Sequence, residues 1–506
     1  MTMISRILGF VRDMVFARIF GADAATDAFF VAFKIPNFLR RLFAEGAFSQ
    51  AFVPVLTDYK ENNSREELQT LVNQVAGTFG VVLFGLTLTG VLAAPLLIMI
   101  FGPGFMDDDN KYNLAVEMLR YTFPYLFFIA LTAFAGGILN SFGRFAAPAF
   151  TPVFLNIVLI TMAVVVSPML EQPIMALAWG VFIAGLVQLL FQFPFLKQLK
   201  LVPRPQWGWK HPGVQRIKTL MLPAIFGSSV VQINLLFDTL IASFLITGSI
   251  SWLYYSDRLV EFPLGLLGIA LATVILPKLS QDHATANQDT FSATMDWALR
   301  SAILVGMPAA VGLIVLAAPM LTTLFYGGAF TPEDVYLSSL SLMAYACGLM
   351  GFILVKVFAP GFYARQDTKT PVKIGIKAMI ANMGLNIIFV VPLYMMEFKG
   401  AHTGLALATA TSAYINAFLL YRALRKENHY KPLAGWPVLL LQVFTACATM
   451  AAVLIWINDP ISTWTQWHTL ERVWHLFLYI AVGFICYLGT LLLTGVKIKS
   501  FLRPSV

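Results

Sequence analysis

The sequence predicts an all-helical protein that crosses a membrane many times. Hydrophobic residues occupy 58% of its 506 positions and charged residues only 12%, whereas soluble domains carry about 25% charged residues. The mean hydropathy is +0.76. Apolar runs of about 20 residues, the length that a helix needs to cross a bilayer, recur along the whole chain. Membrane-spanning strands are shorter and alternate in polarity, so these runs favour helices.

Fourteen apolar windows are expected to be spans, the first at about residues 3–20 and the last at about 473–495. The loops between them differ in charge from one side to the other. On one side they hold 21 basic residues, namely Lys60, Arg65, Arg144, Lys197, Lys200, Arg204, Lys210, Arg216, Lys218, Lys278, Arg365, Lys369, Lys373, Lys377, Arg422, Arg425, Lys426, Lys431, Lys497, Lys499 and Arg503. The opposite loops hold only Lys111, Lys399 and Arg472. The positive-inside rule therefore places both termini in the cytoplasm.

The second half of the sequence repeats the first at a nearly constant spacing. The stretch AAPLLIMIFGPGF at 93–105 matches AAPMLTTLFYGGAF at 317–330. Pro54 has its counterpart in Pro277, and Pro148 has its counterpart in Pro371. Each repeat would hold six spans, an even number, so both would share one orientation around an axis along the membrane normal. We expect an N-terminal lobe at 1–200, a cytoplasmic linker at 201–218, a C-terminal lobe at 219–425 and two appended helices within 434–497.

The predicted linker is basic and rich in Pro and Trp, as the stretch LKQLKLVPRPQWGWKHPGVQRIK (196–218) shows. An ordinary cytoplasmic anchor is the simpler interpretation. A role in binding lipid headgroups or in regulation is the alternative.

The first two spans carry many charges for segments at bilayer depth. They hold Arg6, Arg12, Asp13, Arg18, Asp27, Lys34, Arg40, Arg41 and Glu45. A charge at the bilayer centre costs at least ~2.5–3.5 kcal/mol unless it faces water or a partner. The cationic excess therefore predicts one wall of a polar chamber that receives an anion. Arg18 and Arg41 lie near span ends, where snorkelling to the interface is the alternative.

A second charged cluster lies in span eight, in SWLYYSDRLVEFPLG (251–265). The repeat makes it the counterpart of the region around Lys34. Asp257 and Glu261 share a helix face, so we expect them to position Arg258, which would bind the anion. Several guanidinium groups suit a phosphate or pyrophosphate, which they bind bidentately. The alternative is a structural cluster that neutralises itself.

Other polar residues give weaker signals. A monovalent cation could be bound by Asp238 in span seven together with Asn382 and Asn386 in span eleven. The alternative is that Asp238 is simply hydrogen-bonded within the fold. The three cysteines, Cys347, Cys447 and Cys486, lie in apolar runs and are expected to be small buried residues. The chain shows no motif of ATP hydrolysis, of a metalloprotease or of a nucleophile elbow, and no metal-ligand spacing. No cleavable signal peptide is evident, because the first span is crowded with charge.

Four stretches carry a family resemblance: SRILGFVRDMVFARIFGA, TDAFFVAFKIPNFLRRLFAEGAFSQAFVPVL, YYSDRLVEFPLGLLGIAL and APGFYARQDTKTPVK. They resemble the MviN/MurJ family of lipid II flippases, within the multidrug/oligosaccharidyl-lipid/polysaccharide exporter superfamily, along essentially the whole chain. The resemblance implies fourteen helices, in two six-helix lobes plus two helices that form a lipid groove. It also implies that Arg6, Arg12, Arg40 and Arg258 are cavity arginines, with Ser5, Asp27, Asp257 and Glu261 in or beside the cavity. Members of the family usually begin further upstream, which leaves the true N-terminus open.

The resemblance implies a transporter of the bacterial inner membrane rather than an enzyme. Its substrate would be the undecaprenyl-pyrophosphate-linked peptidoglycan precursor, moved to the outer leaflet by alternating access. We expect neither a cofactor nor a nucleic-acid partner. Transport would be coupled to the membrane potential, to Na⁺ or to H⁺. The protein would be a monomer that contacts phospholipid and proteins of cell-wall synthesis. A cation-coupled drug exporter of the same superfamily is one alternative, and a membrane enzyme acting on a polyprenyl-linked glycan is another.

Overall fold

The computed structural model describes residues 2–285, 287–426 and 429–496, and their regular structure is helical apart from one isolated bridge between Gly327 and Phe330. Three of the basic residues behind the predicted topology, Lys497, Lys499 and Arg503, lie outside these ranges, as does the side chain of Glu45. The chain forms two compact units, which we call unit 1 (Met1–Ser251) and unit 2 (Trp252–Val506).

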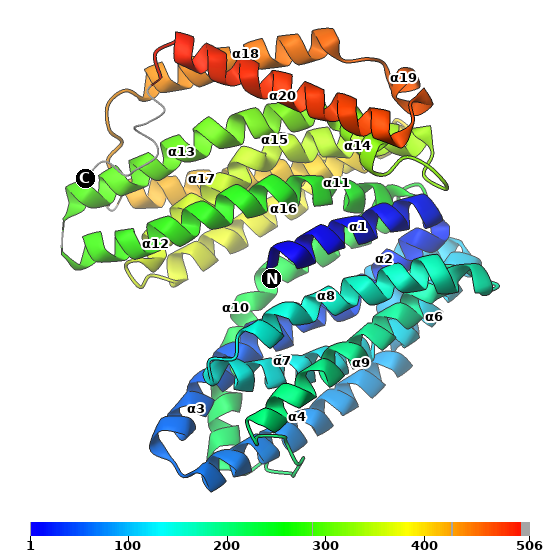
Figure 1. Cartoon of the computed structure of the whole chain (residues 1–506), viewed down its shortest axis with the longest axis vertical. Coiled ribbons are helices and arrows are strands. Elements are labelled where there is room, and N and C mark those ends of the chain that lie inside the picture. Colours follow the sequence, from blue (N-terminus) through cyan, green and yellow to red (C-terminus); the bar gives the residue numbers. More distant parts are fainter. Residues whose placement is uncertain (1, 286, 427–428, 497–506) are drawn as a thin grey trace. The chain divides into compact units, whose positions relative to one another are not determined.

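Unit 1 contains the first two charged spans (Figure 1). Its α-helices are α1 (Thr2–Phe20), α2 (Ala24–Leu39), α3 (Ser49–Asn62), α4 (Arg65–Leu92), α5 (Ala94–Phe101), α6 (Asp109–Thr122), α7 (Tyr125–Ser141), α8 (Ala146–Thr161), α9 (Met175–Gln198) and α10 (Pro212–Ser243). Two π-helical segments, η1 (Arg40–Phe48) and η3 (Met162–Val166), and two 3₁₀ turns, η2 (Pro103–Asp107) and η4 (Ser167–Met169), connect them.

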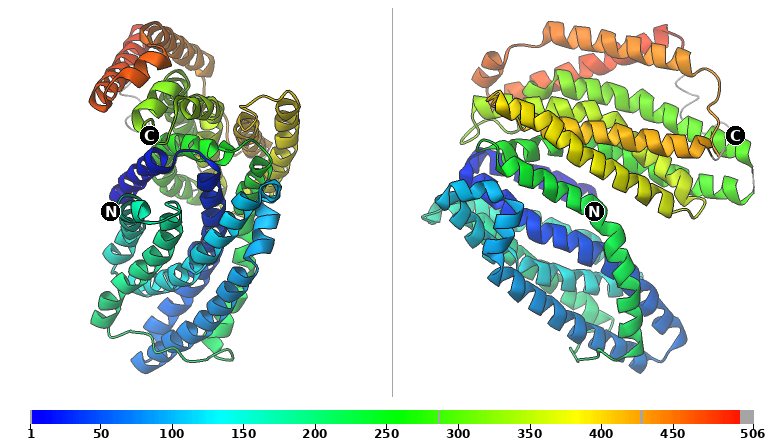
Figure 2. Two further views of the ribbon diagram at one scale, coloured as in Figure 1. Left: turned by 90° about the vertical axis from the view of Figure 1, so that its right-hand side faces the viewer. Right: turned by 180° about the vertical axis from the view of Figure 1, so that it is seen from behind.

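The boundary between the units falls inside α11 (Ser249–Pro263). Unit 2 continues with the π-helical η5 (Leu264–Gly268) and with α12 (Ile269–Ala284), α13 (Gln288–Val315), α14 (Ala317–Leu324), α15 (Pro332–Tyr363), α16 (Lys369–Met395), α17 (Thr403–Lys426), α18 (Trp436–Ile457), α19 (Ile461–Gln466) and α20 (Thr469–Leu493). The last two long helices, α18 and α20, lie side by side in every view (Figures 1 and 2).

The helices confirm a polytopic all-helical membrane protein. Within the described residues, eleven helical segments are long and apolar enough to cross a bilayer. The other three predicted spans fall on α1, on the broken helix α2–η1–α3, and on α10, of which only a shorter apolar part, Ile233–Ser243, is found. Charges inside α1 and the break after α2 explain why those two segments fall short in apolarity or in unbroken length. The count of fourteen spans stays a prediction.

Helix bounds recur at the spacing of the sequence repeat. The 28-residue helix α4 begins at Arg65 and the 28-residue α13 at Gln288, the same offset that separates Pro54 from Pro277. The eight-residue helices that follow them, α5 and α14, begin at Ala94 and Ala317 and are related by that offset too. This agreement supports an internal repeat, while the division into two six-helix lobes stays a prediction.

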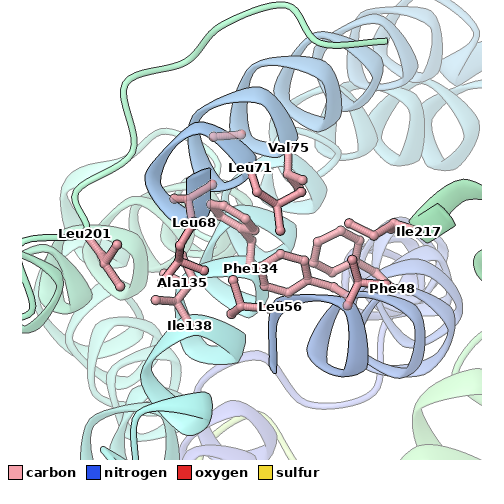
Figure 3. Packing of buried hydrophobic residues seen from close by; sticks show 14 of the residues in the cluster. Phe48, Leu56, Leu68, Leu71, Val75, Phe134, Ala135, Ile138, Leu201 and Ile217 are labelled. Atoms are coloured by element: carbon pink, nitrogen blue, oxygen red, sulfur yellow. The ribbon is translucent and has the colours of Figure 1, made fainter. Parts of the chain in front are cut away.

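A core of apolar side chains holds unit 1 together around α3, α4 and α7 (Figure 3). Phe48 stacks on Phe79 with ring centroids 4.1 Å apart, and Phe52 lies 5.0 Å from Phe134. Leu201, which follows α9, is fully buried in the same core. Burial of aromatic and aliphatic side chains on this scale fixes these helices and the start of the α9–α10 connection as one body.

The cysteine prediction is wrong for one residue. Cys447 is buried and Cys486 half-buried, but Cys347 on α15 is exposed. The apolar run around it predicted burial, yet a membrane helix also presents apolar residues on its outer face.

Candidate functional site

The buried charge of α1 is satisfied by a neighbouring helix. Arg12 and Asp13 are both buried, and the Arg12 guanidinium donates to Asp13 Oδ1 from Nε at 3.0 Å and from Nη2 at 2.7 Å. Arg12 Nη1 also donates to Asn156 Oδ1 on α8 at 3.0 Å. Asn156 in turn donates from Nδ2 to the carbonyl oxygen of Ser5 at 3.1 Å. Two of the predicted site residues, Ser5 and Arg12, are therefore joined through Asn156.

Arg6 has a different environment, because it lies on the exposed side of α1. A step of six residues turns a helix by about 240°, so Arg6 and Arg12 lie on different faces of α1. Their contrast in burial agrees with that geometry. Of these two arginines, Arg6 is the one that α1 presents to its surroundings.

Asp27 lies in the first turn of α2 and is buried among donors from two distant segments. Its Oδ2 accepts from the backbone N–H of Gly248 at 2.8 Å and from Lys111 Nζ at 3.2 Å. Its Oδ1 accepts from the backbone N–H of Ser251 at 3.0 Å and from the Ser251 hydroxyl at 2.7 Å. Four donors surround this carboxylate, so in this arrangement it holds the α10–α11 turn. Lys111, counted from the sequence as an outer-loop charge, is buried beside it.

Further along the same span, Lys34 and Arg40 are half-buried. Lys34 Nζ donates to Thr239 Oγ1 on α10 at 2.6 Å, and Arg40 Nε donates to Asn37 Oδ1 at 2.8 Å. Arg40 also begins the π-helical segment η1, shortly after Pro36. A proline inside a helix removes a backbone hydrogen bond and bends the helix, and the observed change of helix type lies shortly beyond Pro36. Single π turns inside helices occur frequently at functional sites.

The predicted cluster of unit 2 forms on one helix. Arg258 Nη1 donates to Glu261 Oε2 at 2.7 Å, and Arg258 Nη2 donates to Tyr254 Oη at 3.2 Å. The guanidinium also lies over the Tyr254 ring, 4.9 Å from its centroid. Asp257 is half-buried beside Arg258. A π-helical segment, η5, follows the charged residues of this helix, and span two also contains a π-helical segment, η1. The contacts fix the guanidinium while leaving it partly exposed, which suits a group that binds an anion.

The residues proposed for a cation are divided between the units. Asn382 and Asn386 are buried one turn apart on α16, and Asn382 Nδ2 lies 3.4 Å from Thr409 Oγ1. The Oδ1 atom of Asn382 is buried without a hydrogen bond. Asp238 is half-buried on α10 of unit 1. In the described part of the chain, no group of three His, Cys, Asp or Glu residues is arranged to hold a metal.

Sequence reasoning missed the partners of these charges. Asn156, Thr239, Lys111 and Ser251 each contact a predicted site residue within unit 1. Among them, Asn156 is the one amide of its apolar helix. An isolated amide in a membrane helix signals that a partner exists, but it does not identify which partner.

The comparisons with known proteins agree over nearly the whole chain. The profile of the family described as "Lipid II flippase MurJ" matches residues 16–478. The chain is 52% identical over 506 residues to "Probable lipid II flippase MurJ" of Vibrio cholerae, covering 99% of this chain and 95% of the relative. It is 41% identical over 508 residues to "Lipid II flippase MurJ" of Burkholderia cenocepacia, with 99% and 97% covered.

Solved structures show the same likeness. "Lipid II flippase MurJ, inward closed conformation" superimposes with a TM-score of 0.80 at 27% identity, over 99% of this chain and 98% of that one. An inward-facing multidrug resistance MATE family transporter of the MOP superfamily matches with a TM-score of 0.67 at 14% identity, over 84% and 94% of the two chains. The second match is a likeness of fold alone.

Proposed function

The chain belongs to the MurJ family of lipid II flippases, and we propose that it moves lipid II across the bacterial inner membrane. The observation that carries this conclusion is the 52% identity to a relative named for that function, over 99% of the chain. The family is one of transporters, so the protein acts by moving lipid rather than by a covalent reaction. The charged residues of α1, α2 and α11 are consistent with a substrate that carries a pyrophosphate.

We assign the binding of the pyrophosphate to Arg6, Arg40 and Arg258, whose guanidinium groups are exposed or half-buried. Glu261 and Tyr254 support Arg258 in this role through their contacts with its guanidinium. Arg12 differs, because Asp13 and Asn156 already engage it. In this arrangement Arg12 positions α1 against α8, and it reaches the substrate only if these contacts rearrange during transport.

Transport proceeds in this proposal by alternating access, with both termini in the cytoplasm. The pyrophosphate enters from the cytoplasmic side and leaves toward the outer leaflet, while the prenyl chain stays in lipid along α18 and α20. Moving one charge across the membrane potential is worth ~2.3 kcal/mol per 100 mV. The potential, or a monovalent cation bound by Asp238 or by Asn382 and Asn386, resets the cycle.

A leaflet-specific assay tests the function. The purified protein is reconstituted in vesicles with lipid II in one leaflet, and its appearance in the other leaflet is followed with and without an imposed potential. We expect Arg258→Gln to abolish translocation, because the amide carries no charge for the pyrophosphate. Arg425→Gln, at an exposed position near the end of α17, is the matched control and should translocate normally. Normal translocation by the Arg258 variant would contradict the site assignment, and no translocation by the unmodified protein would contradict the function.

The same reconstitution distinguishes the rival functions. A drug exporter would be stabilised by organic cations rather than by a pyrophosphate lipid. A membrane enzyme would convert its lipid substrate in detergent, where no leaflets exist. The MATE likeness, at 14% identity, gives neither rival separate support.

A further inference from the structure

The connection between α9 and α10, residues 199–211, is an ordered strap that lies along the first half of α4. Backbone N–H groups of the strap donate to α4: Arg204 to Asn73 Oδ1 at 2.8 Å, Gln206 to the Asn73 carbonyl at 3.0 Å, and Gly208 to Thr78 Oγ1 at 3.0 Å. Arg65 and Gln69 of α4 donate to strap carbonyls in return. These bonds satisfy backbone groups that a mobile loop would leave to water.

The strap also approaches α4 too closely for a side chain at one point. A Cβ atom added at Gly77 would overlap the backbone of Gln206. At Gly80 and Gly85 of the same helix, an added Cβ would enter open space. Gly77 therefore sets the distance between strap and helix, and Leu201 fixes the beginning of the strap in the core (Figure 3).

The outer side of the strap combines aromatic rings with uncompensated positive charge. Trp207 is 62% exposed and Trp209 40% exposed, and their rings stack with centroids 6.0 Å apart. Lys218 Nζ lies over the Trp209 ring, 4.5 Å from its centroid. Residues 197–218 contain no Asp or Glu, and the acidic partner that the structure shows for this stretch is Asp58, 2.5 Å from Arg216. The remaining exposed basic residues of this stretch are Lys197, Lys200, Arg204 and Lys210.

The position of the strap along α4 matches the edge of a bilayer. Its last bond to α4 is at Thr78. Val81, Val82 and Phe84, the exposed apolar residues that α4 would present to lipid, begin about 4.5 Å further along the helix. Indole rings at this depth occupy the headgroup layer, and nearby Lys and Arg attract anionic lipid.

We propose that the strap is a binding site for anionic phospholipid, in which Trp207 and Trp209 enter the headgroup layer and Arg204 and Lys210 bind the lipid phosphate. The bilayer's own anionic phospholipid is the occupant that the charges favour, because the strap carries a net positive charge and its rings match the depth of the headgroups. The site is separate from the transported substrate, so it stands whatever lipid the protein moves.

Quenching of tryptophan fluorescence by brominated lipid tests the site. The protein is placed in nanodiscs of phosphatidylglycerol and phosphatidylcholine in equal amounts, with bromine on one lipid or the other, so that only the label changes. We expect stronger quenching when phosphatidylglycerol carries the bromine. Arg204→Gln/Lys210→Gln should remove this difference while keeping every tryptophan. Trp207→Phe/Trp209→Phe should remove it by removing the reporters.

Two controls keep the result specific. Trp456→Phe/Trp474→Phe, which removes exposed tryptophans of α18 and α20, should leave the difference unchanged. Gly77→Ala should displace the strap, and so reduce the difference in quenching between the two brominated lipids. It should also speed tryptic cleavage after Lys200 and Lys210. Gly80→Ala should have neither effect. Melting temperatures of all variants confirm that they are folded. Equal quenching by the two labels in the unmodified protein, or a difference that persists in the Arg204/Lys210 variant, would overturn the proposal.

Discussion

Arg12 and Asp13 are neighbours in sequence, and both side chains are buried within unit 1. A buried ion pair costs much of its attraction in desolvation, but breaking it by removing one partner is strongly unfavourable. Here Asn156 adds a third group to the pair from another helix. The pair therefore stabilises the packing of α1 on α8 whether or not it meets substrate.

We expect Arg12→Gln to lower the thermal stability of the protein in detergent, by about 3–5 kcal/mol, because Asp13 would lose its buried countercharge. Arg12→Gln/Asp13→Asn should recover much of that loss, since it removes both charges of the pair. Melting temperatures measure both effects. Transport by a stable double variant then reports whether the charge itself is needed. A single variant as stable as the parent would refute the structural role.

His402, in the turn between α16 and α17, is buried with Nε2 3.0 Å from the Leu337 carbonyl and its ring 5.1 Å from that of Trp252. Burial lowers the pKa of His402 from 6.5 to about 4, because the charged ring would lose its hydration. The folded protein thus binds this proton less readily than the unfolded chain does.

Above pH 6.5, His402 is neutral in both the folded and the unfolded chain and does not lower the free energy of unfolding. Below pH 6.5, the free energy of unfolding should fall by up to about 1.4 kcal/mol per pH unit, and the loss should level off near pH 4. His402→Gln keeps an N–H donor for Leu337 but does not titrate, so it should flatten the melting-temperature profile between pH 7 and pH 4.5. His283→Gln, at an exposed position on α12, is the control. An unchanged slope in the His402 variant would assign the pH dependence to other groups.

Among secondary-structure elements, the connection that leads into the two C-terminal helices converges on one carboxylate of α13. Asp296 Oδ1 accepts from Tyr430 Oη at 2.8 Å, from the Leu433 N–H at 3.2 Å and from Trp436 Nε1 at 2.7 Å. Its Oδ2 accepts from Arg300 Nε at 2.5 Å. Burial and the nearby Asp296 carboxylate raise the pKa of Tyr430, so its hydroxyl remains a donor. This set of bonds holds the α17–α18 connection against α13.

Asp296→Asn should destabilise the connection more than Tyr430→Phe does, because the carboxylate serves four donors and the hydroxyl only one. A hydrogen bond to a charged group contributes about 1.5–3 kcal/mol, which is the loss expected for Tyr430→Phe. Melting temperature and backbone hydrogen exchange at residues 429–436 measure the two effects. Asp289→Asn, exposed in the first turn of the same helix, should change neither. Equal losses for the Tyr430 and Asp296 variants would contradict the shared-acceptor explanation.

Sequence periodicity located the helices well and their irregular turns poorly. The window of span eight coincides with a helical segment long enough to cross a bilayer, whereas span two is a broken helix. The π-helical segments in both spans were not foreseen. An inserted residue in a helix changes the direction of side chains without changing composition. Pro36 signalled a local disturbance, and the packing around it decided its form.

At the scale of the whole molecule, the chain passes from unit 1 to unit 2 inside α11, and Asp27 holds the turn that precedes the boundary. Gly248 and Ser251 donate three hydrogen bonds to this one carboxylate. If the turn before α11 moves relative to α2, these hydrogen bonds must either break or move together with the turn. Asp27 is therefore placed to couple the first charged span to the start of α11.

Asp27→Asn should preserve the shape of the side chain but lose its charge and one acceptor. We expect slower lipid translocation and faster hydrogen exchange at residues 246–251, because the turn loses bonds and Lys111 is left buried without its countercharge. Asp23→Asn is the control, since Asn caps α2 as well as Asp does. Normal exchange in the Asp27 variant would show that the turn is held by other contacts.

The amino-acid sequence was enough to predict the class of protein, eleven of the helical spans, the spacing of the internal repeat and the family, since each of these depends on local composition or on motifs. It also marked the unusual charges, because a charge in an apolar run is visible without a structure. How those charges are satisfied became visible in the three-dimensional packing of the helices. Arg12 on α1 meets Asn156 on α8, and Asp27 on α2 meets Ser251 on α11. Such pairs form between helices that are far apart in the chain. Helical periodicity shows which face of a helix is apolar, but it does not show which other helix packs against that face.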